Sequence, residues 1–195
     1  AKDNYAVVPN DELVNTAREA FTNLKADNYE EKLFCTLGGS RFYGEYTFKD
    51  KTIEVPKVGD TIGLRLTLNN SYDRSCKVGF SMGFVRLICT NGMVTNSRDY
   101  DFDQLHTGKV PIAEAQDAIE RAFKGFNADS MAVFGDMAHQ EITQKQGEII
   151  VDNMAIKSLV SAAARDSVKM IWADPTHQNA DANRNLFNLY NAFTQ

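Results

Sequence analysis

Three aspartates and a histidine in the segment RDYDFDQLH are the first residues whose spacing suggests chemistry. Asp99, Asp101 and Asp103 alternate along the chain, so in an extended segment all three carboxylates face one side, with His106 close by. Carboxylate oxygens suit Mg²⁺ and Mn²⁺, and a bound metal ion can activate water for phosphodiester cleavage. The segment therefore predicts either a metal-dependent nuclease site or, as the simpler alternative, a solvated acidic loop.

Basic residues and a tyrosine in the strand-rich half form the second candidate site. Single-stranded nucleic acid is held without sequence preference by cations that follow its phosphates and by aromatic rings that stack on its bases. The alternative is an ordinary solvent-facing sheet surface on which acids such as Glu45 and Asp73 cancel the positive field. The residues that we expect to bind nucleic acid are Lys32, Arg41, Tyr43, Arg65, Arg74, Lys77, Arg86 and Arg98.

Arg86 stands between apolar residues in the run from Val85 to Cys89. It is expected either in a buried ion pair or as a cation directed into a groove, because an unpaired buried guanidinium is costly.

Several other chemistries lack a motif in this chain. There is no G-x-x-x-x-G-K-[ST] loop, which disfavours ATP-driven recombinases and helicases of that type. Gly38, Gly39 and Ser40 could cradle a phosphate through backbone N–H groups, although a plain hairpin turn is the simpler interpretation. No H-E-x-x-H motif supports a zinc hydrolase.

The candidate sites must be positioned by strands in the first half of the chain and helices in the second. Ile62, Leu64, Leu66 and Leu68 alternate with more polar residues, which is the pattern of a strand with one buried face. Further strands are expected over residues 29–37, 41–48, 52–55 and 78–84, with a short one over 5–8. The turns between them are too short for crossover helices, so they predict an antiparallel meander of about five strands.

Helical periodicity appears after Pro9, where Asn10 is expected to cap a helix, and again from Pro111 onward. Helices are expected from about residue 10 to 24, from 111 to 126, from a cap at Thr143 to residue 151, from 155 to 165, around Trp172, and from 183 to 193. Strands followed by helices predict an α+β fold, strand-rich over 1–100 and helical over 111–195. A length of 195 residues with 43% hydrophobic content predicts one domain over residues 1–195.

Three short motifs carry a resemblance. They are Asn70-Ser71-Tyr72-Asp73, the run from Arg86 through Thr90-Asn91-Gly92 to Met93, and the closing Leu189-Tyr190-Asn191-Ala192-Phe193-Thr194. In these motifs the chain resembles an uncharacterised family of phage- and plasmid-borne proteins, domain of unknown function 932. Arg74 stands where the family's turn has a glycine. The resemblance implies mobile-element origin and a role near nucleic acid.

Charge and cysteine content narrow the class of protein. The net charge is −5, with 14 Lys/Arg against 15 Asp/Glu in residues 1–110 and 7 against 11 in residues 111–195. The acidic excess argues against coating DNA by bulk charge, but the nearly neutral first half can still carry a local basic face. Cys35, Cys76 and Cys89 form no C-x-x-C pair and suit reduced thiols better than a zinc site.

The chain shows no charged-then-apolar leader and no apolar run near 18 residues. We therefore expect a protein in the cytoplasm of a bacterial host, without membrane association.

Two functions of different class follow from the residues. The first is an ATP-independent, non-enzymatic protein of phage recombination that binds and anneals single-stranded DNA as a homo-oligomer. Its order of a β-meander followed by helices is similar to that of Rad52-like annealing proteins, an analogy of architecture. The second is a nuclease with Mg²⁺ or Mn²⁺ bound by Asp99, Asp101 and Asp103. A structural or host-interaction protein is the remaining alternative.

Overall fold

The computed structural model describes residues 5–55, 60–86, 102–107, 111–125, 129–176 and 183–194. Contacts divide the chain into two compact units. The first, here called the sheet unit, comprises residues 1–52, 63–85 and 94–127, and the second, the helical unit, comprises residues 53–62, 86–93 and 128–195. The single domain over residues 1–195 stays a prediction.

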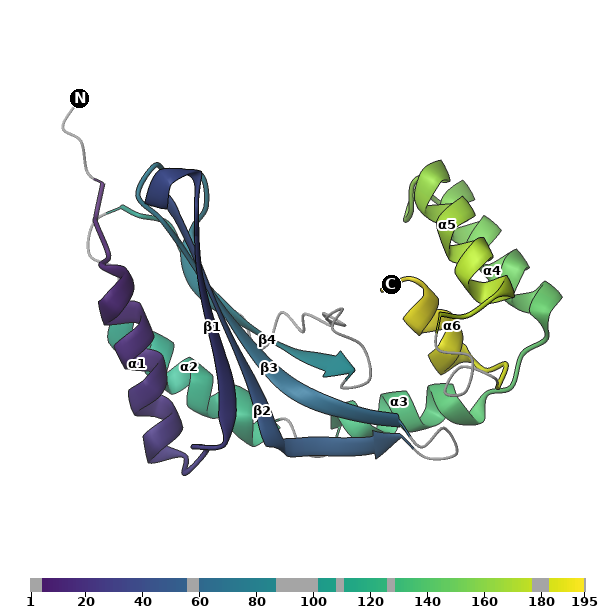
Figure 1. The fold of residues 1–195 in the computed structure, drawn as a ribbon, viewed down its shortest axis with the longest axis horizontal. Helices are drawn as coiled ribbons and strands as arrows, with labels where there is room; N and C mark the ends of the chain where they lie inside the picture. The colour runs from purple at the N-terminus through teal and green to yellow at the C-terminus, as the bar shows by residue number, and fades with distance from the viewer. Residues whose placement is uncertain are drawn as a thin grey trace. The chain divides into compact units, whose positions relative to one another are not determined.

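An antiparallel sheet dominates the first half of the chain (Figure 1). Its strands are β1 (Tyr29–Thr36), β2 (Arg41–Val55), β3 (Asp60–Ser71), β4 (Val78–Arg86) and β5 (Phe102–Gln104), and neighbours in the sheet are neighbours in sequence. This order confirms the predicted meander, and the helices that follow it confirm the α+β class. The short strand expected over residues 5–8 is reduced to a single bridge between Tyr5 and Thr107.

Strand β2 is longer than the sequence suggested. A turn was expected at Lys49-Asp50-Lys51, between strands over 41–48 and 52–55, but the strand continues through these residues to Val55. That prediction was wrong because the polar run was read as a turn, whereas Lys49 extends the ladder by donating its backbone N–H to the Asn28 carbonyl at 2.9 Å.

One face of the sheet is buried under two helices, α1 (Asn10–Asn23) and α2 (Ile112–Gly125). The α1 residue Phe21 packs edge-on against Tyr46 at 5.1 Å and Phe48 at 5.0 Å between ring centroids, and Phe48 meets Phe123 of α2 at 4.7 Å. On β2 from residue 41 to 48 and on β3 from 61 to 68, residues of this face are buried and those between them are mostly half-exposed. We call the opposite, half-exposed face the outer face.

Helix α1 begins differently from the prediction. Asn10 was expected to cap it, but the cap position is Pro9, and no side chain caps the helix. The Asn10 side chain instead accepts a hydrogen bond from Asn70 Nδ2 at 2.7 Å. The helix start is therefore fixed by a contact with β3.

The helical unit contains α3 (Asp129–His139), α4 (Gln144–Ile156), α5 (Ala162–Ala173) and α6 (Leu186–Ala192). The predicted cap at Thr143 is confirmed, and a capping box with Gln146 completes it. A helix over residues 155–165 was wrong, because α4 ends at Ile156 and Ser161 starts a new helix by accepting from the N–H of Ala164 at 3.1 Å. Helix α3 was not predicted.

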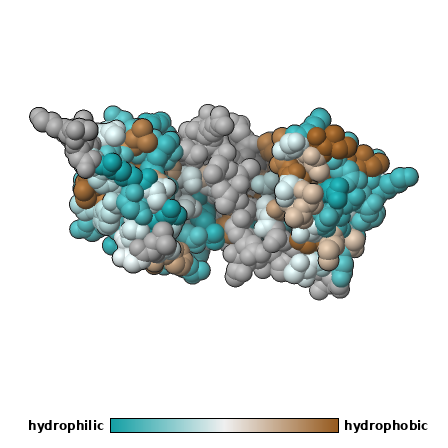
Figure 2. Space-filling model, turned by 90° about the horizontal axis from the view of Figure 1, so that it is seen from above, coloured by the Kyte–Doolittle hydropathy of each residue, from teal (hydrophilic) through white to brown (hydrophobic). Residues whose placement is uncertain are grey.

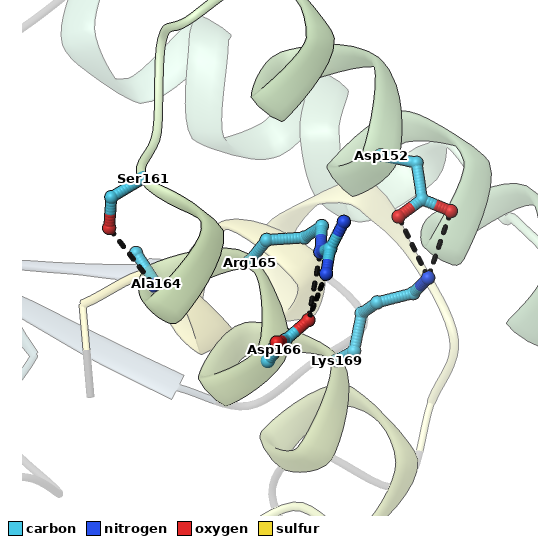
Figure 3. A network of polar contacts seen from close by, with 6 residues as sticks. All are labelled: Asp152, Ser161, Ala164, Arg165, Asp166 and Lys169. Carbon is cyan, nitrogen blue, oxygen red and sulfur yellow. Dashed lines mark hydrogen bonds and ion pairs between the residues drawn. The ribbon is translucent and has the colours of Figure 1, made fainter.

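Polar pairs line the α4–α5 hairpin (Figure 3). Lys169 of α5 donates to both carboxylate oxygens of Asp152 of α4 at 2.8 Å, while Arg165 pairs with its neighbour Asp166 at 2.7 Å. Trp172 of α5 is 1% exposed, and its indole N–H donates to the Gln144 carbonyl at 3.1 Å. Gly147 makes room for this ring, because a Cβ there would lie 2.4 Å from Trp172 Nε1.

Figure 2 shows hydrophobic surface, in brown, over the α4–α5 hairpin. Ile156 at the end of α4, Leu159 in the connection and Met170 on α5 are 78%, 66% and 74% exposed. Among the described residues, no helix is long and apolar enough to cross a membrane.

Candidate nucleic-acid interface

The outer face of β1 and β2 carries three consecutive cross-strand pairs that combine charge and aromatic rings. In the β1–β2 register, Lys32 lies opposite Glu45, Phe34 lies opposite Tyr43, and Thr36 lies opposite Arg41. Directly opposed residues project from the same side of a sheet, with Cβ atoms about 5 Å apart. Each of the two outer pairs therefore places a cation beside the central aromatic pair.

Strand β3 adds Arg65 to the same face. Its Nε donates to the Thr47 hydroxyl at 3.2 Å, and its guanidinium lies 3.9 Å from the Glu45 carboxylate. Thr47 and Glu45 both project outward from β2. The Arg65 side chain therefore extends from β3 over β2 on the outer face. The Arg65 side chain is 16% exposed, so most of it is covered by neighbouring residues of the sheet.

The acid Glu30 on the outer face lies close to several cations. Lys32 pairs with Glu30 at 3.1 Å on the same strand. The hydrogen bond and charge of Lys32, together with the more distant charges of Lys49 and Arg65, lower the pKa of the Glu30 carboxyl. Asp73 lies near Arg41, and the hydrogen bonds from Ser75, together with the charge of Arg41, lower the pKa of the Asp73 carboxyl. The four cations Lys32, Arg41, Lys49 and Arg65 set against Glu30, Glu45 and Asp73 leave this surface with a net charge of about +1.

The structure thus brings together Lys32, Arg41, Tyr43 and Arg65 from the predicted set. Arg41 is steadied by the β3–β4 turn, because its Nε donates to the Ser75 hydroxyl at 2.5 Å. Lys77, which precedes β4, forms an exposed ion pair with Asp103 of β5 at 2.9 Å. Its charge is therefore shared with a carboxylate.

Arg74 and Arg86 do not join this surface. The Arg74 guanidinium lies 5.1 Å from the centre of the Tyr5 ring, at the turn after β3. Arg86 is 2% exposed, which is the buried position that the sequence had left open. Its role in binding nucleic acid stays a prediction.

The acidic segment is only partly described. Arg98, Asp99 and Asp101 lie outside the described residues, so the predicted metal site stays a prediction. Asp103 pairs with Lys77, and no group of three or more His, Cys, Asp or Glu residues able to hold a metal occurs within the described ranges.

His106 contacts the N-terminal segment rather than a metal. Its Nδ1 lies 3.0 Å from the Ala6 carbonyl oxygen, and its ring stacks on Tyr5 with 4.8 Å between centroids. A carbonyl can only accept, so Nδ1 carries the proton in this hydrogen bond. His106 therefore helps to hold residues 5 and 6 against the sheet unit.

The Asn70-Ser71-Tyr72-Asp73 motif is a structural junction in the sheet unit. Asn70 is completely buried, and its amide donates to the Val8 carbonyl at 2.8 Å. The Ser71 hydroxyl and the Cys76 backbone exchange two hydrogen bonds, which closes the turn after β3. Arg74 in this turn has φ of 66°, the left-handed conformation that explains why a glycine also suits the position. The motif fixes the end of the sheet near Arg41.

Two residues of the outer face were missed from the sequence. Phe34 was assigned to a strand but not to a face, and Lys49 was assigned to a turn. The turn expected at residues 38–40 would have set Cys35 opposite Tyr43, whereas the four-residue connection 37–40 sets Phe34 there, because a hairpin register follows from its connection.

A hollow of about 470 Å³ in the helical unit is a further candidate for a ligand site. Arg184 lines it, but its guanidinium already donates to the Trp172 and Ala173 carbonyls and lies over the Trp172 ring at 4.5 Å. Gln146 is likewise engaged with Thr143. These two groups are therefore occupied in stabilising the unit.

No curated protein and no solved structure matches the chain. The similarity to Rad52-like annealing proteins therefore stays an expectation. A family defined as a domain of unknown function, DUF932, matches residues 1–195, in agreement with the motifs at residues 70–73, 86–93 and 189–194. The chain belongs to the DUF932 family.

Proposed function

We propose that this protein binds single-stranded DNA on the outer face of its sheet and promotes annealing of complementary strands. In this proposal it acts without ATP, as a homo-oligomer, in the recombination of a phage or plasmid within the host cytoplasm. One observation carries the proposal: Lys32, Arg41 and Arg65 lie with Tyr43 on one face of the antiparallel sheet.

The chemistry of this surface fits an extended polyanion. The pairs that contain Lys32 and Arg41 are four residues apart along the strands, about 13 Å at 3.3 Å per residue. Cations at this spacing can contact separate phosphates of one strand, and the local net charge of about +1 attracts the strand although the whole chain is acidic.

Annealing requires that the bound strand can still pair. Cations that hold the phosphates leave the Watson–Crick edges of the bases free for an incoming strand, and no covalent step or nucleotide hydrolysis is needed. A few cations in each chain bind DNA weakly, so we propose that several chains act together, because linked weak contacts give a high overall affinity.

The test measures how affinity for oligo(dT) depends on salt. Lys32→Ala combined with Arg65→Ala should weaken binding and flatten the plot of log K against log salt by about 0.7 for each lost phosphate contact. The matched control is Arg121→Ala with Lys124→Ala, which removes the same charges from exposed positions on α2, over the other face.

An unchanged salt slope in a folded Lys32/Arg65 variant, or an equal loss in the α2 control, would overturn the proposed interface. Annealing itself is followed with complementary labelled strands in the absence of ATP. A rate no faster than that of the strands alone would overturn the annealing role.

A further inference from the structure

The central cross-strand pair of the outer face, Phe34 and Tyr43, has a property that the charges do not explain. Phe34 is 45% exposed in the interior of β1, and Tyr43 beside it on β2 is half-exposed. Within the described part of the chain, neither ring makes a contact with another aromatic ring. Part of each side chain is therefore accessible to a ligand.

The neighbours of this pair are polar. Lys32 and Glu45 flank it on one side, and Thr36 and Arg41 flank it on the other. Scattered apolar residues are normal on protein surfaces, so exposure alone indicates nothing. Two adjacent aromatic residues between two cations are different, because they supply both elements by which single-stranded nucleic acid is held.

We propose that Phe34 and Tyr43 form a platform on which unpaired bases stack while Lys32 and Arg41 hold the adjoining phosphates. The inference rests on the proposed function and specifies its ligand. Bases inside a duplex are already stacked on their neighbours, so an exposed ring on a flat sheet cannot reach their faces without unstacking them. The platform thus selects unpaired strands, which cations alone do not.

Stacking also suits the annealing step. A base that lies flat on a ring presents its Watson–Crick edge sideways, so it can pair without leaving the protein. Every base has a π-face, and the platform therefore has no strong sequence preference.

The experiment compares binding of fluorescein-labelled oligo(dT) with binding of an abasic deoxyribose-phosphate oligomer of equal length. These probes have the same charge and differ only in the bases. Wild-type protein should bind oligo(dT) about 5- to 150-fold more tightly for each stacked base. Phe34→Ala should remove much of this preference and leave affinity for the abasic oligomer unchanged, while Phe34→Tyr should retain it.

Leu33→Ala is the matched control, because Leu33 is 44% exposed on the same strand and lies on the opposite face, where its Cδ2 would be 3.3 Å from a Cβ at Gly44. It should bind both probes as wild type does. Thermal melting of each variant shows that it is folded.

The outcomes separate this inference from the proposed function. Equal, salt-dependent binding of both probes by wild type overturns the platform and leaves phosphate capture intact. A preference for oligo(dT) that survives Phe34→Ala and Tyr43→Ala also overturns it. Failure to bind either probe overturns the proposed function together with the platform.

Discussion

Removing the acids from the outer face should make the protein bind single-stranded DNA more tightly. Glu30 lies 3.1 Å from Lys32, and Glu45 lies 3.9 Å from Arg65, so each carboxylate competes with a phosphate for a cation. The variant with Glu30→Gln and Glu45→Gln keeps the side-chain size and removes both competitors. An increase in affinity is informative because a misfolded protein does not produce it.

The magnitude follows from Coulomb's law. A phosphate that contacts either cation would lie roughly 4–7 Å from the carboxylate, where two unit charges in water repel by about 0.6–1 kcal/mol. Screening at physiological salt, with a Debye length of about 8 Å, reduces each value to roughly half. Two substitutions should therefore improve affinity by about 3- to 5-fold, and the gain should diminish as salt rises.

Fluorescence anisotropy of labelled oligo(dT) at several salt concentrations measures this gain. The control combines Glu19→Gln on α1 with Asp117→Asn on α2, two exposed acids on the helices that cover the other face. Equal tightening by the control would show that net charge alone acts. No tightening by the Glu30/Glu45 variant would refute the reasoning.

Three further predictions concern the framework that positions the interface. Gly147→Ala should destabilise the helical unit by about 1–3 kcal/mol, because its Cβ would lie 2.4 Å from Trp172, and the fluorescence of this single tryptophan should report the change. Asn70→Ala should cost about 1–3 kcal/mol in urea unfolding, since it leaves a buried backbone carbonyl without its donor; a cost below 0.5 kcal/mol on the same scale would contradict the junction. Glu31→Gln should lower stability at pH 7 by about 0.5–1 kcal/mol, because the bidentate hydrogen bonds from Arg18 hold the pKa of Glu31 below its usual 4.5. This stabilisation exists above the unfolded pKa and is lost as pH falls through the folded value, so the gap between variant and wild type should close in acid.

Local patterns in the sequence predicted most of the sheet. The alternation from Ile62 to Leu68 predicts which side of β3 is buried. Thr143 predicts a helix start because its side chain accepts a hydrogen bond from the first turn of the helix. Strands that contain a polar run were harder to predict from the sequence. Lys49 lies in such a strand, and its backbone N–H donates to the carbonyl of Asn28, a residue far from it in sequence. The boundary between α4 and α5 was missed for another reason, because apolar residues occur on both sides of Ser161.

The candidate site was predicted in part. Side-chain alternation placed Arg41 with Tyr43 on one face, and the sheet added Lys32 and Arg65. Alternation within one strand cannot show that Phe34 lies opposite Tyr43, because this requires the register between strands. Burial of Arg86 was undecided from sequence, since its apolar neighbours suit both a groove and a core.

Ultraviolet cross-linking of oligo(dT) to the wild-type protein, followed by mass spectrometry of the modified peptides, tests the central claim most directly. The account predicts cross-links at Phe34 or Tyr43 whose yield decreases when unlabelled single-stranded DNA or high salt is added. Cross-links confined to residues 128–195, or to the helices α1 and α2, would contradict it.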